Sequence, residues 1–146
     1  MTEHQDLLSA SALTAFRLNG QFLSLAERLA EPAGLTATRW QVLGAILGQP
    51  LPVAAIARAM GITRQSVQRT ADLLAADGLV EFRDNPAHRR ARLLAPTAAG
   101  LAAVRAIDPG HRVAADRLSE ILDADRWRQA LDALRDLSAA LDKLHP

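Results

Sequence analysis

Hydrophobic residues between positions 52 and 77 recur every three or four residues, which is the spacing of one face of an α-helix. The pattern stops at Gly61 and begins again after Thr63, so it predicts two short helices joined by a tight turn. Pro52 suits the first position of the first helix, because its missing N–H has no helical partner there. Gly61 suits the left-handed residue that ends such a helix, and Thr63 suits the N-cap of the next one.

The second of these helices has two unlike faces. Val67, Ala71 and Leu74 form an apolar side. Polar residues occupy the opposite side and the first turn, namely Arg64, Gln65, Ser66, Gln68, Arg69 and Asp72. Arginine and glutamine can each make two hydrogen bonds to the edge of a guanine or an adenine in the major groove. A helix-turn-helix presents such a face to that groove, which makes Arg64, Gln65, Ser66, Gln68 and Arg69 candidate DNA contacts. An ordinary solvated helix face has a similar composition, so the flanking elements decide between the two interpretations.

After Gly78 the hydrophobic pattern changes to alternation. Residues 79–82 and 92–95 are predicted to form the two strands of a hairpin. The loop between them is polar and basic, and its candidate contacts are His88, Arg89 and Arg90. A hairpin beside a recognition helix is a wing, and a basic wing tip can enter the minor groove or grip phosphate. The alternative is a solvated polar loop.

Longer helical patterns flank this central segment. Residues 9–31 are predicted to form the first of these helices, and a second helix is predicted to start at Thr36. The pattern resumes at Thr97 and is interrupted at residues 108–110, where proline and glycine predict a kink or a break. The last helix is predicted to start at Asp123 or Asp125 and carries leucines at heptad-like spacing. Its apolar stripe and that of the first helix must pack on each other or on a second copy of the chain.

These elements predict a mainly α fold with a small β-hairpin wing, organised as one domain over residues 1–146. A winged helix-turn-helix lobe spans 35–97, and a helical dimerisation region combines 1–34 with 98–146. The length fits a single domain.

The motifs as a set resemble the MarR family of bacterial transcriptional regulators. The likeness runs in order over nearly the whole chain, through residues 60–81, Asn85–Arg90 and 97–100. The resemblance implies a homodimer whose winged helix-turn-helix lies between helices from both chain ends, and which binds a palindromic double-stranded DNA operator. In this family the wing usually carries acidic residues where this chain has Asn85 and His88, and the acid before the arginine pair orients the wing. Pro96 replaces an apolar strand residue, so the returning strand is expected to end early.

The resemblance also implies a small aromatic or amphipathic effector, bound between the dimer helices and the DNA-binding lobe. Phe16, Arg17, Arg39 and Trp40 are candidates for lining its pocket, with arginine pairing an acidic ligand. The alternative is that Phe16 and Trp40 belong to the core and that the two arginines are solvated.

Composition narrows the range of functions. Cysteine is absent, so disulfides and thiol-based redox sensing are excluded. The net charge is only +1, but residues 36–97 hold eight arginines and four acidic residues, a balance of +4, which leaves −3 for the remainder. Aromatic residues make up 3% of the chain, which favours duplex DNA over stacked single strands.

No catalytic or metal site emerges from the sequence. It has no glycine-rich phosphate loop, and its histidines, His4, His88, His111 and His145, lack metal-ligand spacing. We therefore predict a non-enzymatic regulator without a cofactor or metal. No apolar run approaches the length of a membrane span, and the acidic N-terminus is unlike a signal peptide, so we expect a soluble, cytoplasmic protein.

The predicted function is a sequence-specific regulator of transcription, a repressor that a small ligand releases from DNA. Two alternatives remain at this point. The winged helix can serve as a protein-interaction module that never binds DNA, or the protein can bind DNA without any ligand. The concentration of arginine on the recognition helix and the wing argues against the first of these.

Overall fold

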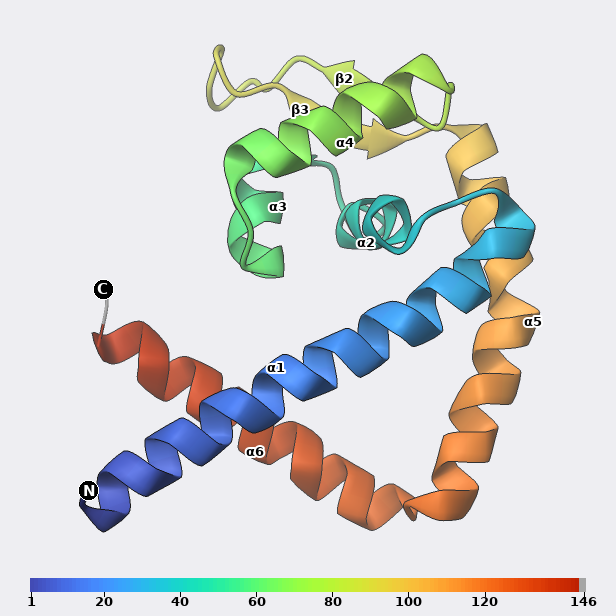
Figure 1. Ribbon diagram of the computed structural model, residues 1–146. Helices are drawn as coiled ribbons and strands as arrows, with labels where there is room; N and C mark the ends of the chain where they lie inside the picture. Colours follow the sequence, from blue (N-terminus) through green and yellow to red (C-terminus); the bar gives the residue numbers. More distant parts are fainter. Residues whose placement is uncertain (145–146) are drawn as a thin grey trace. The chain divides into compact units, whose positions relative to one another are not determined.

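The computed structural model describes residues 1–144 of the chain (Figure 1). In chain order its elements are α1 (Glu3–Ala30), a 3-10 turn (Glu31–Ala33), α2 (Ala37–Ala45), β1 (Leu51–Pro52), α3 (Val53–Met60), α4 (Arg64–Ala76), β2 (Val80–Arg83), β3 (Leu93–Pro96), α5 (Ala98–Ile121) and α6 (Ala124–Leu144). The predicted fold class, mainly α with a small β-hairpin, is confirmed. The chain divides into two compact units, one covering Met1–Asp108 and the other beginning at Pro109.

The helix-turn-helix is built from the predicted caps. Gly61 ends α3 with a φ of 68°, in the left-handed region. The Thr63 hydroxyl accepts a hydrogen bond from the Ser66 amide at 3.1 Å and so starts α4. Pro52 is the N-cap of α3 and not its first helical residue, which places the start of this helix one residue later than predicted. The same capping chemistry starts α2, where the Thr36 hydroxyl accepts from the Arg39 amide at 3.1 Å.

The first helix is longer than the sequence pattern indicated. It begins at Glu3 because Thr2 and Gln5 form a reciprocal capping box. The Gln5 amide donates to the Thr2 hydroxyl at 3.2 Å, and the Thr2 amide donates to the Gln5 side chain at 2.8 Å. Near the other end of α1, the Glu27 carboxylate accepts from the Ala37 amide at 2.6 Å. This bond ties the last turns of α1 to the start of α2.

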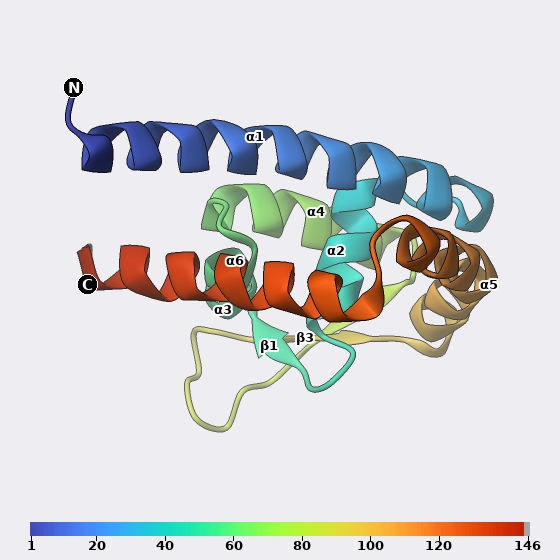
Figure 2. The same ribbon diagram turned by 90° about the horizontal axis from the view of Figure 1, so that it is seen from below.

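The sheet has three antiparallel strands in the order β1–β3–β2, and Figure 2 shows β1 beside β3. The short strand β1 was not predicted. It pairs Leu51 with Leu94, while β2 pairs Val80 with Pro96. The expectation that the returning strand ends before Pro96 was wrong, because Pro96 is the last residue of β3. Beyond Leu94, β3 has only β2 as a neighbour, and a proline without an N–H is tolerated at such a strand end.

Apolar side chains of α2, α3, α4 and β3 form the core of the winged helix-turn-helix lobe. The largest fully buried ones are Leu43, Ile46, Ile56, Leu74, Leu94, Val42 and Val67. Because Val67 and Leu74 are both 0% exposed, one face of α4 is fixed against this core. The opposite face of α4 therefore has a defined direction.

The N-terminus of α5 is held against the end of α4 by Thr97 and Gly100. The Thr97 hydroxyl donates to the Gly78 carbonyl at 2.6 Å and accepts from the Gly100 amide at 3.1 Å. The Thr97 amide donates to the Leu79 carbonyl at 3.1 Å. A Cβ atom at position 100 would overlap that same carbonyl oxygen and crowd Leu43. Only glycine allows this approach.

Of the kink or break predicted at residues 108–110, the break is absent, since α5 runs through Pro109 to Ile121. The boundary between the two compact units nevertheless lies at this proline. Helix α6 starts as predicted after Asp123, whose carboxylate accepts from the Arg126 amide at 3.0 Å. None of the helices described is long and apolar enough to cross a membrane.

Candidate nucleic-acid interface

The outward face of α4 carries the predicted recognition residues. Arg64, Gln65, Gln68 and Arg69 are exposed, and Ser66 is half-buried. Gln65 and Arg69 lie opposite the buried Val67 side of the helix, Ser66 and Gln68 lie at its flanks, and Arg64 lies in the first turn. They are therefore arranged for contact with a surface outside the lobe, as the sequence predicted, although their binding to DNA stays a prediction.

One of these side chains has a fixed orientation. The Gln68 side-chain amide donates from Nε2 to Oδ1 of Asp72, one helical turn later, at 2.9 Å. This bond uses one of the two amide hydrogens and leaves the second hydrogen and the carbonyl oxygen of Gln68 available. An amide that offers one donor and one acceptor side by side matches the major-groove edge of adenine.

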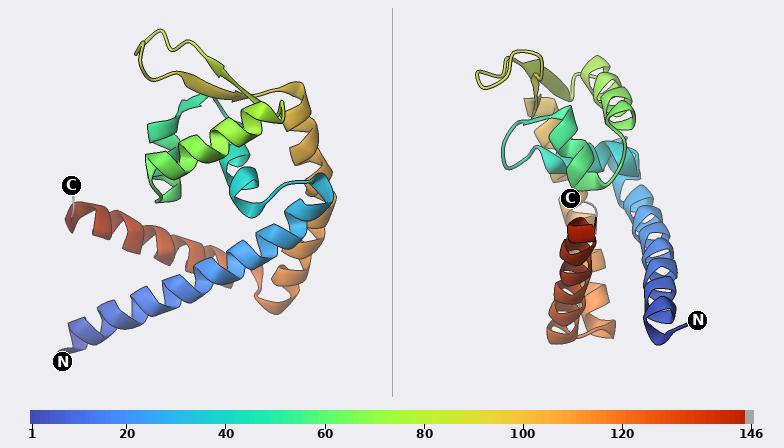
Figure 3. Two further views of the ribbon diagram at one scale, coloured as in Figure 1. Left: turned by 45° about the horizontal axis from the view of Figure 1, so that its top comes forward. Right: turned by 90° about the vertical axis from the view of Figure 1, so that its left-hand side faces the viewer.

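The wing is the loop between β2 and β3, which projects away from α4 (Figure 3). Asn85 organises it. Its side chain donates to the Ala91 carbonyl at 2.8 Å, across the loop, and accepts from the Ala87 amide at 3.0 Å. Two successive turns follow, closed by the His88 amide on the Asn85 carbonyl at 3.1 Å and by the Ala91 amide on the His88 carbonyl at 3.2 Å. The neutral Asn85 thus orders the wing of a chain that lacks the acidic residues usual in the resembled family.

The predicted wing contacts occupy the tip of this ordered loop. His88, Arg89 and Arg90 are all exposed. Neither arginine forms an ion pair with any residue that the structure describes. Two uncompensated guanidinium groups on an ordered loop are suited to bind anionic groups, because the guanidinium fork matches the geometry of phosphate and carboxylate oxygens.

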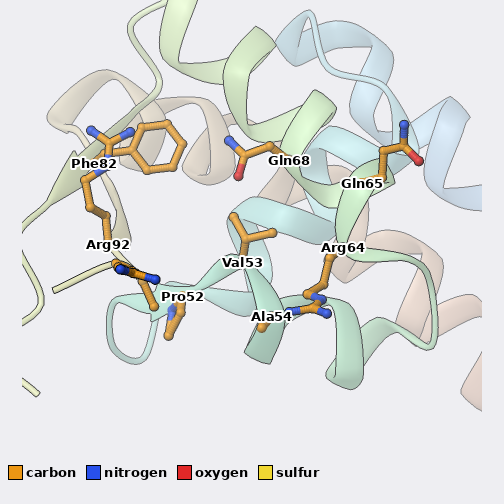
Figure 4. A pocket seen from close by; sticks show the side chains of 10 residues that line it. Pro52, Val53, Ala54, Arg64, Gln65, Gln68, Phe82 and Arg92 are labelled. Carbon is orange, nitrogen blue, oxygen red and sulfur yellow. The ribbon is translucent and has the colours of Figure 1, made fainter. Parts of the chain in front are cut away.

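An open hollow of about 480 Å³ lies between the start of α3, the face of α4 and the wing (Figure 4). The residues lining it include Val53, Arg64, Gln68, Phe82, Arg90 and Arg92. The guanidinium of Arg92 stacks over the Phe82 ring at 4.5 Å from its centroid. Neither residue of this pair was predicted from the sequence as a contact. The available signal was strand alternation, since Phe82 pairs with Leu94 and Arg92 lies two residues from Leu94 on the same strand face.

The four candidate pocket residues lie on two helices, α1 and α2. Phe16 is 72% exposed on α1, and Arg17 beside it is also exposed. Trp40 is half-buried and packs against the core of the lobe. Arg39 is not free, because it forms an ion pair with Asp77 of α4 at 2.9 Å. The location of an effector pocket at these residues stays a prediction.

The described part of the chain holds no group of three histidine, cysteine or acidic side chains that could bind a metal ion. Of the histidines considered from the sequence, His145 lies outside the described residues.

Comparison with known proteins places this geometry in a family. A model of the MarR family matches residues 33–91. The uncharacterized protein Rv2011c of Mycobacterium tuberculosis is 35% identical over 141 residues, which are 97% of this chain and 99% of that protein. Among solved structures, the M. tuberculosis regulator MosR in complex with DNA has a TM-score of 0.77 and 22% identity, covering 92% of this chain and 98% of MosR. CouR from Rhodococcus jostii bound to p-coumaroyl-CoA has a TM-score of 0.76 and 23% identity, covering 86% of this chain and 90% of CouR.

Proposed function

This chain belongs to the MarR family, and from that membership we propose that it is a sequence-specific transcriptional regulator that binds double-stranded DNA. One observation carries the proposal. The exposed polar face of α4 and the ordered, uncompensated arginines of the wing lie on the same lobe. A recognition helix needs such a face for base edges, and a wing needs such cations for phosphate or the minor groove.

The binding species is a homodimer on a palindromic operator. Large apolar side chains are exposed on α1 and α6, at Leu13, Phe16, Leu134, Leu137 and Leu141. Exposed apolar surface of this extent marks a protein interface, and a second copy of the chain covers it. Two-fold symmetry then requires two half-sites, about 34 Å apart, on one face of the DNA.

The regulator is a repressor that a small aromatic or amphipathic acid releases from DNA. CouR, a protein of the same fold, was crystallised with p-coumaroyl-CoA, which supports a ligand of this class. The ligand lies near Phe16, Arg17, Arg39 and Trp40, and it acts by binding one spacing of the two DNA-binding lobes more tightly than the other.

Binding of the protein to DNA upstream of its own gene tests the main proposal. A gel shift across a salt series, with scrambled DNA as the control, should show a preference of at least about a thousandfold for the operator. Equal binding to both DNAs would remove sequence specificity from the proposal. No binding to either would favour the protein-interaction alternative.

Thermal shift with a panel of aromatic acids tests the ligand. A ligand at one hundred times its Kd stabilises the folded state by about 2.7 kcal/mol. Arg17→Ala should abolish this shift while leaving the melting temperature of the free protein unchanged, because Arg17 is exposed. An undiminished shift in Arg17→Ala would place the ligand elsewhere.

A further inference from the structure

We propose that the hollow between α3, α4 and the wing holds one backbone phosphate of the bound DNA, and that Arg92, supported by the Phe82 ring, is its central cation. This inference rests on the proposed DNA binding and adds a specific site to it. Neither Phe82 nor Arg92 was among the contacts expected from the sequence.

Three arginines line this hollow. Arg64 comes from the first turn of α4, and Arg90 and Arg92 come from the wing. Figure 4 labels Arg64 and Arg92. The residues lining the hollow include no acidic side chain, and none of these arginines forms an ion pair with a described residue. The cluster therefore carries a charge of +3 without an internal counterion. It is therefore suited to an anion from outside the chain.

The orientation of Arg92 is set by the strand register. Phe82 pairs with Leu94, so Arg92 is the diagonal neighbour of Phe82 on the same face of the hairpin. Aromatic and long side chains reach each other across such a diagonal, and the guanidinium lies 4.5 Å from the ring centroid. A stacked guanidinium keeps its N–H groups in the plane of the fork, so it can still bind two oxygen atoms of a phosphate.

The place of the hollow on the lobe identifies the phosphate as one from the DNA backbone. The proposed mode puts α4 in the major groove and the wing tip at the minor groove. The strand of sugar and phosphate that separates these two grooves must pass between α4 and the wing. The hollow lies at this position and is lined by both elements.

The sharpest test compares Arg92→Ala with Arg83→Ala. Arg83 belongs to the same hairpin, but Glu81 already neutralises it at 2.8 Å. Arg92→Ala should weaken binding to operator and scrambled DNA alike, and should make the log–log slope of affinity against salt shallower by about one per half-site. When the salt concentration rises fourfold, the affinity of Arg92→Ala should therefore fall by a factor about three times smaller, per half-site, than the affinity of the wild type. Arg83→Ala should keep the wild-type slope.

A second experiment locates the phosphate. Single methylphosphonate substitutions, each removing one backbone charge, are scanned along both operator strands. Wild-type protein should lose affinity at each contacted phosphate, and Arg92→Ala should lose its sensitivity at one position per half-site while keeping the others. Free inorganic phosphate at millimolar concentration should not compete with DNA for the protein beyond its effect on ionic strength. The reason is that the backbone phosphate is held in the hollow only while α4 and the wing also contact the duplex.

The role of Phe82 is tested by rescue. Phe82→Leu should lower affinity severalfold and Phe82→Tyr should restore it, because tyrosine keeps a ring under the guanidinium. In the Arg92→Ala background, Phe82→Leu should have no further effect on binding.

The outcomes separate the two proposals. If the wild-type protein binds no DNA, the proposed function fails. If it binds the operator but Arg92→Ala keeps the wild-type slope and methylphosphonate pattern, or if Arg83→Ala changes the slope as much, only the phosphate site is overturned.

Discussion

At the scale of single residues, the bond between Gln68 and Asp72 makes a carboxylate part of the proposed recognition face of α4. Asp72 is exposed on the helix face proposed to enter the major groove of the negatively charged DNA, where its own charge opposes binding. Its benefit is the fixed orientation of the Gln68 amide, held at 2.9 Å. We therefore expect Asp72 to lower the affinity for DNA through its charge and to raise the discrimination between bases through its bond to Gln68.

Two substitutions of Asp72 separate these effects. Asp72→Ala should raise affinity for scrambled DNA and lower the discrimination for adenine at the contacted position by about 1 kcal/mol, part of the 1–3 kcal/mol of a bidentate contact. Asp72→Asn removes the charge but keeps an oxygen acceptor for Gln68, so it should bind more tightly without losing discrimination. Binding to operators with each base at that position measures both. Equal discrimination in all three proteins would show that Gln68 needs no partner.

The second residue-scale prediction concerns Asn85. Asn85→Ala removes two hydrogen bonds of the wing, each with a net value of about 1 kcal/mol. Because the wing tip is exposed and lies outside the core, the melting temperature should change by only a few degrees. Hydrogen exchange of the Ala87 amide should speed up, and DNA affinity should fall severalfold. A large fall in global stability would instead show that the wing supports the core.

At the scale of elements, the approach of α5 to the end of α4 depends on one glycine. Gly100→Ala places a Cβ against the Leu79 carbonyl, and should destabilise the protein by about 3 kcal/mol as the helix shifts. Gly44→Ala makes the same change on α2, where no atom lies within 4 Å of the added group. It should stabilise by up to about 1 kcal/mol. Thermal unfolding of both variants checks this difference in sign.

The elements that the sequence predicted best are those set by local chemistry. Thr36, Thr63 and Gly61 each act within a few residues, so the ends of α2, α3 and α4 follow from their neighbours alone. Strand β1 was missed because two residues carry no periodic pattern, and only pairing with β3 defines it. The continuation of α5 through Pro109 also departs from local preference, and no contact described here accounts for it.

The candidate site also contains some residues that could be predicted from local sequence and others that could not. The contacts on α4 follow from helical period, since Val67 fixes the inward side and Gln68 lies away from it. The stacking of Arg92 on Phe82 depends on the register of the hairpin, which the turn chemistry of the wing determines. The Asn85 side chain closes the same loop through its bond to the Ala91 carbonyl. Residues brought together by register are not visible in a pattern along the chain.

At the scale of the whole molecule, the exposed leucines of α6 are a feature that packing within one chain does not explain. Leu134 is 41% exposed and Leu141 is 49% exposed, and they lie seven residues apart on one helical face. Placing a charge at both, with Leu134→Glu and Leu141→Glu, should give a monomer by sedimentation at micromolar concentration, because a buried unpaired charge costs several kcal/mol. Gln129→Glu on the same helix is the matched control and should stay dimeric.

The monomeric variant also tests how the operator is read. A dimer binds its second half-site at a high effective concentration, so loss of dimerisation should lower operator affinity by about 10²- to 10⁴-fold. Binding to a single half-site should change little, because α4 and the wing belong to the unit Met1–Asp108 and α6 does not. Titrations with half-site and full-site DNA measure both values. A double variant that remains dimeric, or a monomer that binds the full operator as tightly as the wild type, would show that the leucines of α6 do not join the two copies that read the palindrome.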